Sequence, residues 1–353
     1  MTGWLPASPL RLLKPKMAIN LAMNTSIKRI LLAGDIGGTK TLLQLFEAGG
    51  SVLAERRFDS AAFASLEQVV AAFLGDFPSF PLAAACFGVA GPVDGGRASI
   101  TNLPWQIDAA AISVEFRIPQ VRLINDFQAV AYGIESLESR DMATLQAGVP
   151  QEHGVRAVIG AGTGLGECFM VWQGGHYSIF PSEGSHADFA PVDAQQIDLL
   201  RYLAARYGHV SYERLLSGTG LVNTFEFLRD SQGRQATAEL QSAIKAGNPA
   251  AAISGCAMGG KDELAVSALD LFARIYGAEA GNLALKVLAR GGVYIAGGIA
   301  PQIMGKLEDG TFLRAFADKG RFVGLLKDIP VHVVLNPKVG LMGAARVAER
   351  GFP

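Results

Sequence analysis

The sequence predicts an α/β fold with two related halves that face each other. From residue 29 onward, apolar runs of strand length alternate with segments of helical periodicity, a pattern typical of α/β proteins. A unit of strand, Gly/Thr-rich turn and second strand starts at Arg29, and a similar unit starts at Arg156. Such a repeat favours two related halves, although two glycine-rich hairpins can also resemble each other by chance. The 353 residues are long enough for two lobes.

The first half is expected to open with a buried strand that ends in Gly34-Asp35 and turns at residues 36–39. Unbroken aliphatic runs predict buried strands, and apolar residues three and four positions apart predict helices. On these signals the strands cover residues 29–33, 41–46, 51–58, 82–89 and 121–124, and the helices cover residues 66–74 and 127–134.

The second half repeats the opening hairpin and then becomes mostly helical. Strands at 157–159 and 168–172 flank the loop Gly160–Gly166, and helical periodicity dominates residues 195–288. A buried strand at 292–296 precedes Gly297-Gly298, and a strand at 331–335 and a helix at 341–350 close the chain. We expect a small α/β domain of residues 29–136 with 337–353 and a large α/β domain of residues 137–336.

Composition and charge exclude several classes of protein. The chain has 31 basic and 32 acidic residues, a net charge of −1, and no basic run interleaved with aromatic residues. Binding to nucleic acid or to an anionic membrane needs clustered positive charge, so we expect neither. No apolar run approaches the ~20 residues that cross a bilayer. The scattered cysteines Cys86, Cys168 and Cys256 predict thiols in a reducing compartment, and therefore a cytoplasmic protein, and not a disulfide framework or a zinc cluster.

Residues 1–28 are expected to lie outside the fold. Pro6, Pro9 and Pro15 interrupt this leader, which lacks the apolar stretch and cleavage site of a secretory signal. Met17 and Met23 offer later start codons. We therefore expect the leader to be disordered or not translated.

The turn Asp35-Ile-Gly37-Gly38-Thr39 is a candidate phosphate site. Glycine exposes backbone N–H groups to an approaching phosphate because it has no Cβ. A carboxylate beside the turn repels the phosphates, but through water it can hold the Mg²⁺ ion that bridges them. The alternative is an ordinary glycine hairpin with Asp35 as its cap.

Two further glycine turns follow buried strands. The loop Gly160–Gly166 does not match the dinucleotide fingerprint, because Leu165 or Glu167, depending on register, stands where the third glycine is required. Thr163 can donate its hydroxyl to a phosphate oxygen. Gly297-Gly298 lets a flat ring lie against bare backbone. Three such turns are a far more specific signal than any one of them.

A near match to a different phosphate loop lies at residues 255–262. The Walker A pattern requires Ser or Thr at the position that Asp262 occupies, because that hydroxyl binds Mg²⁺. The preceding residues 250–254 also lack the character of a buried strand. We interpret the segment as a loop between helices.

Asn125-Asp126 follows a short strand and opens a helix, at the edge where open α/β sheets bind ligands. An aspartate there can accept the proton of an attacking hydroxyl. A plain helix N-cap, for which both residue types are favoured, explains the pair equally well.

The segment from Glu183 to Asp188 brings carboxylates and the imidazole of His186 together. Its spacing matches no zinc pattern, and Gly184-Ser185 indicates a loop. Carboxylate and imidazole groups suit hydrogen bonding to a polyhydroxylated ligand. Glu213 is a weaker candidate that also reads as a surface charge on a helix.

Together the motifs resemble those of the bacterial glucokinases of the actin-like sugar kinase and chaperone ATPase superfamily, from about residue 29 to the C-terminus. The resemblance rests on their order along the chain: LLAGDIGGTKT, TNLPW, LINDF, GAGTGLG, SEGSHADFAP, GHVSYERLLSGTGLVN, GGVYIAGGIAP, DKGRF and GLMGAA. It implies a two-lobed actin-like (ribonuclease H-like) ATPase fold with a ligand cleft between the domains, ATP and Mg²⁺ as cofactors, and a homodimer.

The resemblance also implies a role for each matching residue. Asp126 is implied to be the catalytic base that takes the proton of the glucose 6-hydroxyl, giving glucose 6-phosphate and ADP. The implied sugar contacts are Asn125, Glu183, His186 and Glu213. The first phosphate motif is implied to contain Asp35, Gly37, Gly38 and Thr39, with Asp35 also holding Mg²⁺ through water, and the second to contain Gly162, Thr163 and Gly164. Gly297 and Gly298 are implied to contact adenosine.

Two positions depart from the family pattern. Lys40 stands where close relatives often have Asn, and DIGGTK is also typical of the ROK (repressor, ORF, kinase) family. ROK proteins carry a cysteine-rich zinc loop, for which this chain has no counterpart. Ser185 replaces an expected glycine and adds a side chain to the sugar loop.

Three other functions remain open from the sequence. A kinase for another hexose would share every motif, since specificity depends on loop details. A non-catalytic sugar sensor or repressor would need a DNA-binding domain, which the short proline-broken leader cannot form. An actin- or chaperone-like ATPase would hydrolyse ATP without any dependence on sugar.

Overall fold

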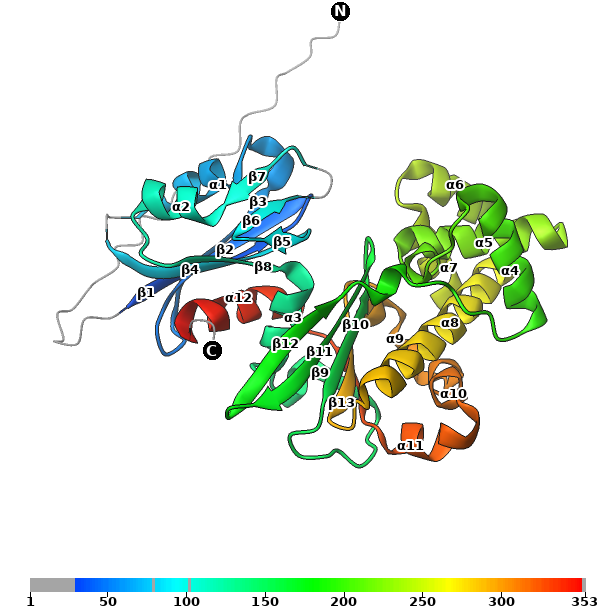
Figure 1. Cartoon of the computed structure of the whole chain (residues 1–353). Coiled ribbons are helices and arrows are strands. Elements are labelled where there is room, and N and C mark those ends of the chain that lie inside the picture. The colour runs from blue at the N-terminus through cyan, green and yellow to red at the C-terminus, as the bar shows by residue number, and fades with distance from the viewer. Residues whose placement is uncertain (1–28, 78–79, 101–102, 351–353) are drawn as a thin grey trace, which may run out of the picture.

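The computed structural model describes residues 29–77, 80–100 and 103–350. The expected leader and Thr101-Asn102 of the TNLPW motif therefore lie outside the described residues. The described residues form two large β-sheets that lie side by side, each with its own helices, and a small third sheet. Helix α3 (Asp126–Ile134) lies between the two large sheets (Figure 1). This two-part α/β architecture confirms the predicted fold class.

The first sheet has five strands in the order β3-β2-β1-β4-β8. Strand β1 pairs antiparallel with β2, while β1, β4 and β8 are parallel. Their bounds are β1 Ile30–Ile36, β2 Lys40–Glu47, β3 Val52–Asp59, β4 Leu82–Val89 and β8 Val121–Asn125. A small antiparallel sheet beside it contains β5 Val93–Asp94, β6 Arg97–Ser99 and β7 Gln106–Asp108.

Helices cover both faces of the first sheet. Helices α1 (Leu66–Leu74) and α2 (Ala109–Phe116) bury Val69, Phe73 and Ile112 against one face. The C-terminal helix α12 (Val339–Arg350) packs on the other face and contacts β1 and β4 (Figure 1). The end of the chain therefore belongs to the core of the first sheet.

The second sheet has six strands in the order β12-β11-β10-β13-β14-β9. Strands β10, β13 and β14 are parallel, and β11, β12 and β9 run antiparallel to their neighbours. The bounds are β9 Met142–Gln146, β10 Arg156–Ala161, β11 Leu165–Gln173, β12 His176–Ser182, β13 Gly292–Ala296 and β14 Val331–Val334.

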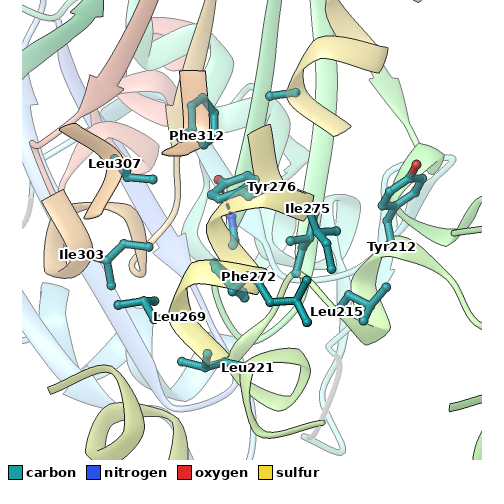
Figure 2. Packing of buried hydrophobic residues seen from close by; sticks show 14 of the residues in the cluster. Tyr212, Leu215, Leu221, Leu269, Phe272, Ile275, Tyr276, Ile303, Leu307 and Phe312 are labelled. Carbon is teal, nitrogen blue, oxygen red and sulfur yellow. Dashed lines mark hydrogen bonds between the residues drawn. The ribbon is translucent and has the colours of Figure 1, made fainter. Parts of the chain in front are cut away.

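The long helix α8 (Glu263–Val287) is the centre of the larger core. Its Tyr276 is fully buried among Phe272, Phe312 and neighbouring aliphatic side chains (Figure 2). The Tyr276 hydroxyl accepts a hydrogen bond of 3.1 Å from the N–H of Ala161, the last residue of β10. The other helices around α8 are α4 Ala194–Tyr207, α5 Gly218–Gln232, α6 Ala238–Ala246, α7 Pro249–Met258, α9 Met304–Glu308, α10 Thr311–Ala317 and α11 Val323–Asp328.

Helices α3 and α12 cross with their backbones in direct contact. A methyl group on Gly343 of α12 would overlap with the carbonyl oxygen of Ala129 in α3. A methyl group on Gly133 of α3 would likewise overlap with the carbonyl of Val339. Only glycine permits so close an approach, and the crossing fixes the start of α3 relative to the first sheet.

Most predicted elements are confirmed, with small changes at their ends. Helix α1 and strands β4 and β13 have the predicted bounds. Strand β1 continues through Asp35 to Ile36, so the aspartate lies in the strand and not in the turn. The sequence did not predict the short strands β5, β6, β7 and β9, the strand β12 or the helix α2.

Gly343→Ala is predicted to destabilise the protein, because the added methyl group must push α3 and α12 apart. Overpacking of this kind costs about 1–3 kcal/mol, and the melting temperature should fall accordingly. The matched control is Gly255→Ala in the interior of α7, where an added methyl group meets no atom within 4 Å. That change should leave the melting temperature unchanged or raise it. Equal behaviour of the two variants would contradict the close crossing.

Candidate active site

The first group of predicted site residues lies at the carboxyl edge of the first sheet. Asp35 in β1 stands opposite Gly88 in β4, and the next residue, Val89, stands opposite Asn125 at the end of β8. Parallel strands end at a common edge, so these residues meet there. Asp126 follows directly as the first residue of α3.

Asp126 has the electrostatic character of a tuned base. Burial and the neighbouring Asp35 carboxylate raise its pKa to about 6, against hydrogen bonds from the start of α3 that favour its charged form. Burial also raises the pKa of Asp35, and the Lys40 ammonium opposes that rise. A methyl group on Gly340, at the start of α12, would lie 3.7 Å from the Asp35 carboxylate. Two carboxylates are thus held together at one sheet edge.

This pair of carboxylates suits a hard cation that is held through water. Asp35 and Asp126 supply oxygen atoms, the ligands that Mg²⁺ prefers, and their mutual repulsion falls when a cation is near. Among residues 29–77, 80–100 and 103–350, no three His, Cys, Asp or Glu side chains form a direct metal site. The residues present therefore fit an ion bound mainly by a nucleotide and water.

Asn125 is committed chiefly to capping α3. Its Oδ1 accepts from the N–H groups of Phe127 and Gln128, and Gln128 returns a hydrogen bond to the Asn125 N–H, which completes a capping box. Its Nδ2 donates to the carbonyl of Gly91 at 3.1 Å. The Asn125 side chain also forms a hydrogen bond with the Asp126 carboxylate, which uses its second amide hydrogen.

The first glycine loop is held from behind by Ser60. The Ser60 hydroxyl donates to the carbonyl of Gly37 at 2.8 Å, and its N–H donates to the carbonyl of Thr39 at 3.1 Å. The Gly37 N–H closes the turn on the carbonyl of Lys40. These bonds turn both carbonyls toward the protein, and Gly38 and Thr39 lie at the surface of the turn.

The second glycine loop joins β10 to β11. The Gly162 N–H bonds to the carbonyl of Gly164 at 2.8 Å, and the carbonyl of Gly162 accepts from the N–H of Gly218 at the start of α5. A methyl group on Gly162 would meet no atom within 4 Å, so this position opens outward. Thr163 lies between the two glycines and is exposed. The loop thus has the open backbone expected of a phosphate site.

The third glycine turn lies beside the second. Gly297 has a φ of +81°, and a methyl group there would overlap with the carbonyl of Ala161. The same carbonyl accepts from the N–H of Ile299 at 3.2 Å. Gly297 is therefore required by backbone conformation, whereas Gly298 faces open space.

Phe127 connects the two halves of the site. Methyl groups on Gly160 and Gly166, which flank the second loop, would both overlap with or crowd the Phe127 ring. The ring thus packs on the β10–β11 hairpin, while Asp126 next to it faces Asp35. The spacing of these two glycines therefore serves an aromatic ring and not a phosphate.

The predicted sugar contacts lie on two adjacent 3₁₀ turns, η3 (Gly184–His186) and η4 (Tyr212–Arg214). Glu183 and His186 are exposed, with Oε2 and Nε2 3.9 Å apart. Glu213 is partly buried, and its Oε2 accepts from the N–H of Leu165 at 2.9 Å. The turns are tied by the Tyr212 N–H, which donates to the carbonyl of Ala187. The arrangement presents two carboxylates and an imidazole together.

Three residues of the site escaped the sequence analysis. Ser60 has no recognisable signal, because its partner loop lies 23 residues earlier. Gly218 follows the N-cap Ser217 of α5, and that cap signature could have indicated a helix start beside the loop. Phe127 appeared only as a helical apolar residue.

The segment resembling a Walker A loop is only partly the predicted loop between helices: residues 255–258 complete α7, and residues 259–262 connect it to α8. Gly255 lies inside α7, and Asp262 is the N-cap of α8, where its Oδ1 accepts from the N–H of Ala265 at 2.8 Å. The other carboxylate oxygen accepts from Thr237. Cys86, Cys168 and Cys256 are free thiols, and the first two are buried. Among the helices of the described residues, none combines the length and apolar character needed to cross a bilayer.

Comparison with known proteins identifies the family. The glucokinase family model matches residues 32–351. A glucokinase of Nostoc sp. is 47% identical over 340 residues, which cover 91% of this chain and 99% of the relative. A crystal structure of a glucokinase from an Antarctic psychrotroph has a TM-score of 0.80 at 31% identity, covering 91% of this chain and 99% of that one. A glucokinase from Balamuthia mandrillaris in complex with glucose, 24% identical over 91% of this chain and 94% of its own, has a TM-score of 0.76 and shares the fold. The chain belongs to the glucokinase family.

Proposed function

We propose that this protein is a glucokinase, which transfers the γ-phosphate of ATP to the 6-hydroxyl of D-glucose. The observation that carries the proposal is the Asp126 carboxylate, whose pKa is raised to about 6 beside two glycine loops. A base with a pKa slightly below neutrality is ionised at pH 7 and still accepts a proton. The names of the relatives, all glucokinases, support the same activity.

The two glycine loops are assigned to the phosphates of ATP. Gly37, Gly38 and Thr39 form the turn between β1 and β2, and Gly162, Thr163 and Gly164 form the turn between β10 and β11. Backbone N–H groups in open turns stabilise phosphate oxygens without a charged side chain. Gly297 and Gly298, next to the second loop, are assigned to adenosine, because bare backbone admits a flat ring.

Glucose is assigned to the side chains that face it across the site. Glu183, His186, Glu213 and the Asn125 side chain hold its hydroxyl groups, and Asp126 accepts a hydrogen bond from the 6-hydroxyl. In the transfer, the 6-oxygen attacks the γ-phosphorus, its proton passes to an Asp126 oxygen, and ADP leaves. Mg²⁺, when bound with ATP, neutralises charge that develops on the phosphates, and Asp35 would hold it through water.

The proposal also covers the two lobes, their closure on glucose, the localisation and the oligomeric state. We assign residues 29–136 with 337–353 to a small lobe and residues 137–336 to a large lobe, with the substrates between them. Closure of the lobes on glucose would exclude water, which otherwise competes as nucleophile. A cytoplasmic homodimer is the expected form of the protein.

The direct test is ADP production by the purified protein with and without glucose. We expect rapid ADP release that requires glucose and Mg²⁺, with glucose 6-phosphate as product. A panel of fructose, mannose and N-acetylhexosamines measures specificity, and a better substrate in that panel would reassign the enzyme to another hexose. ATP hydrolysis at the same rate without any sugar would reject the proposal in favour of an ATPase.

Asp126→Asn is predicted to retain glucose binding and to lose nearly all turnover. The amide preserves shape but cannot accept the proton, and a general base contributes ~10²–10⁴-fold. Steady-state kcat and the dissociation constant for glucose measure the two effects separately. A variant that kept more than about a tenth of the wild-type kcat would remove Asp126 from the role of base.

The activity is predicted to fall in acid, because Asp126 must be ionised to accept a proton. Its raised pKa places the midpoint of kcat/KM near pH 6, with a rise toward neutrality and a loss below it. Initial rates at low glucose over pH 5–7 give this midpoint, and recovery at pH 7.5 excludes unfolding. A kcat/KM that is constant down to pH 5 would show that no group with such a pKa controls the reaction.

A further inference from the structure

A second pair of carboxylates lies buried behind the sugar loop, where sequence reasoning assigned no function. Glu167 in β11 is only 3% exposed, and Glu279 in α8 is fully buried. They act on each other electrostatically, since Glu279 opposes the ionisation of Glu167. When two buried carboxylates share a site, ionising both costs much more free energy than ionising two separate carboxylates in water.

Glu167 lies directly under the loop that carries Glu183 and His186. Its cross-strand partner on β12 is Ser182, the residue before Glu183. A methyl group on Gly184 would overlap with Oε2 of Glu167, so the backbone of η3 rests on this carboxyl group. The Ser182 hydroxyl accepts from the Gly184 N–H at 3.0 Å and closes the turn over it.

Glu279 supports the neighbouring turn, η4. It forms a hydrogen bond with the Tyr212 hydroxyl, and Tyr212 directly precedes Glu213. Asn282 donates to Oε2 of Glu279 at 2.8 Å, and the Lys286 ammonium lies 3.4 Å from Oε1. The carboxylate pair therefore contacts both turns that present the predicted sugar ligands.

The hydrogen bonds decide which member of the pair carries the negative charge. Glu279 has donors for both oxygens and a cation beside it. Glu167 Oε1 is buried without a hydrogen-bond partner, which is far more costly for an anion than for a neutral acid. The charge accordingly resides on Glu279, and Glu167 keeps the proton.

We propose that Glu167, in its neutral form, is a positioning residue that fixes the sugar loop Glu183–His186, with Glu279 as the anion that keeps it neutral. Ionisation of Glu167 places two adjacent anions beneath the loop and displaces Gly184, so glucose binds more weakly. The proton exchanges with solvent, and no bond other than O–H forms or breaks. This inference rests on the proposed binding of glucose at these turns.

The surroundings of Glu167 set the pH at which this change occurs. Burial, and then the Glu279 carboxylate, raise the pKa of Glu167 to about 7, and the Lys286 ammonium opposes the rise. Two other ionisable groups are coupled to Glu167, the Tyr276 hydroxyl of α8 and the Cys168 thiol beside it in β11. Burial chiefly raises the pKa of both, with the Glu167 charge as a further cause, so neither ionises near pH 7. Ile159 of β10, Ser182 of β12 and Gly184 of η3 have no ionisable side chain. Because the competent form is protonated, it predominates below pH 7 and is lost above it. The pH dependence expected from Asp126 runs in the opposite direction, because its competent form is the ionised one.

The test measures the KM for glucose from pH 6.5 to 8.5 in wild type and in Glu167→Gln, which mimics the neutral acid. In wild type, the KM should rise with pH, by up to about 20-fold if only the neutral form binds. In Glu167→Gln it should stay near the low-pH value of wild type throughout. The KM for ATP should change by less than about twofold in both, because the contact is to the sugar loop.

Two further variants distinguish this role from general damage. Glu279→Gln removes the second anion, so ionisation of Glu167 no longer places two charges beneath the loop, and the rise in KM with pH should be reduced. Glu263→Gln, on the same helix but 98% exposed, should reproduce the wild-type profile. A wild-type KM for glucose that is constant over this range, or an unchanged pH dependence in Glu167→Gln, overturns the inference.

If Glu167→Gln folds poorly, the contact between Glu167 and Gly184 can be tested with a second set of variants. Gly184→Ala should raise the KM for glucose, because its methyl group collides with Glu167, and Glu167→Ala in that background should recover part of the loss. Strictly additive effects would overturn the contact. Absence of glucose phosphorylation by wild type at pH 6.5 would instead reject the proposed function, so the two failures are distinguishable.

Discussion

The packing of helix α3 against both halves of the molecule is the constraint on which the site depends. On one side, Gly133 and Gly343 bring α3 and α12 into backbone contact beneath the first sheet. On the other, the Phe127 ring rests on the glycines that flank the second loop. Asp126 lies between these contacts, at the start of the helix, and faces Asp35. Movement of α3 would change the distance from Asp126 to both glycine loops at once. Glycine is used at these contacts because any side chain would separate the elements.

In each of two carboxylate pairs, one carboxylate raises the pKa of the other, but the two pairs are proposed to act in opposite protonation states. Asp35 and Asp126 lie at the sheet edge, where a nucleotide-bound cation can relieve their repulsion. Glu167 and Glu279 lie deeper, and only Glu279 has donors for both oxygens, so the pair is satisfied by one proton on Glu167. The first pair must lose its proton to act, and the second must keep one. If both proposals hold, efficient catalysis is expected between the pKa of Asp126, about 6, and that of Glu167, about 7.

The glycine loops show that one residue type serves several physical purposes in a single motif. Gly162 faces open space, although its own N–H and carbonyl are bonded to Gly164 and Gly218. Gly160 and Gly166 accommodate an aromatic ring, and Gly297 adopts a φ of +81° against a neighbouring carbonyl. A family resemblance transfers all these glycines as one unit, and the contacts separate their roles. Substitutions at Gly160 and Gly162 should therefore fail for different reasons.

The sequence by itself determined the fold class, most strands of both sheets and the candidate residues, because these depend on local periodicity and on motif order. Helix α1 and strands β4 and β13 were predicted to the residue, since α1 has clear helical spacing and each strand is a continuous apolar segment between clear breaks. The tertiary structure alone decided which residues meet. The support of the first loop by Ser60, the Phe127 contact and the Glu167–Glu279 pair join segments far apart in the chain. Local pattern carries no information on such contacts, because desolvation and charge coupling exist only after the chain has folded.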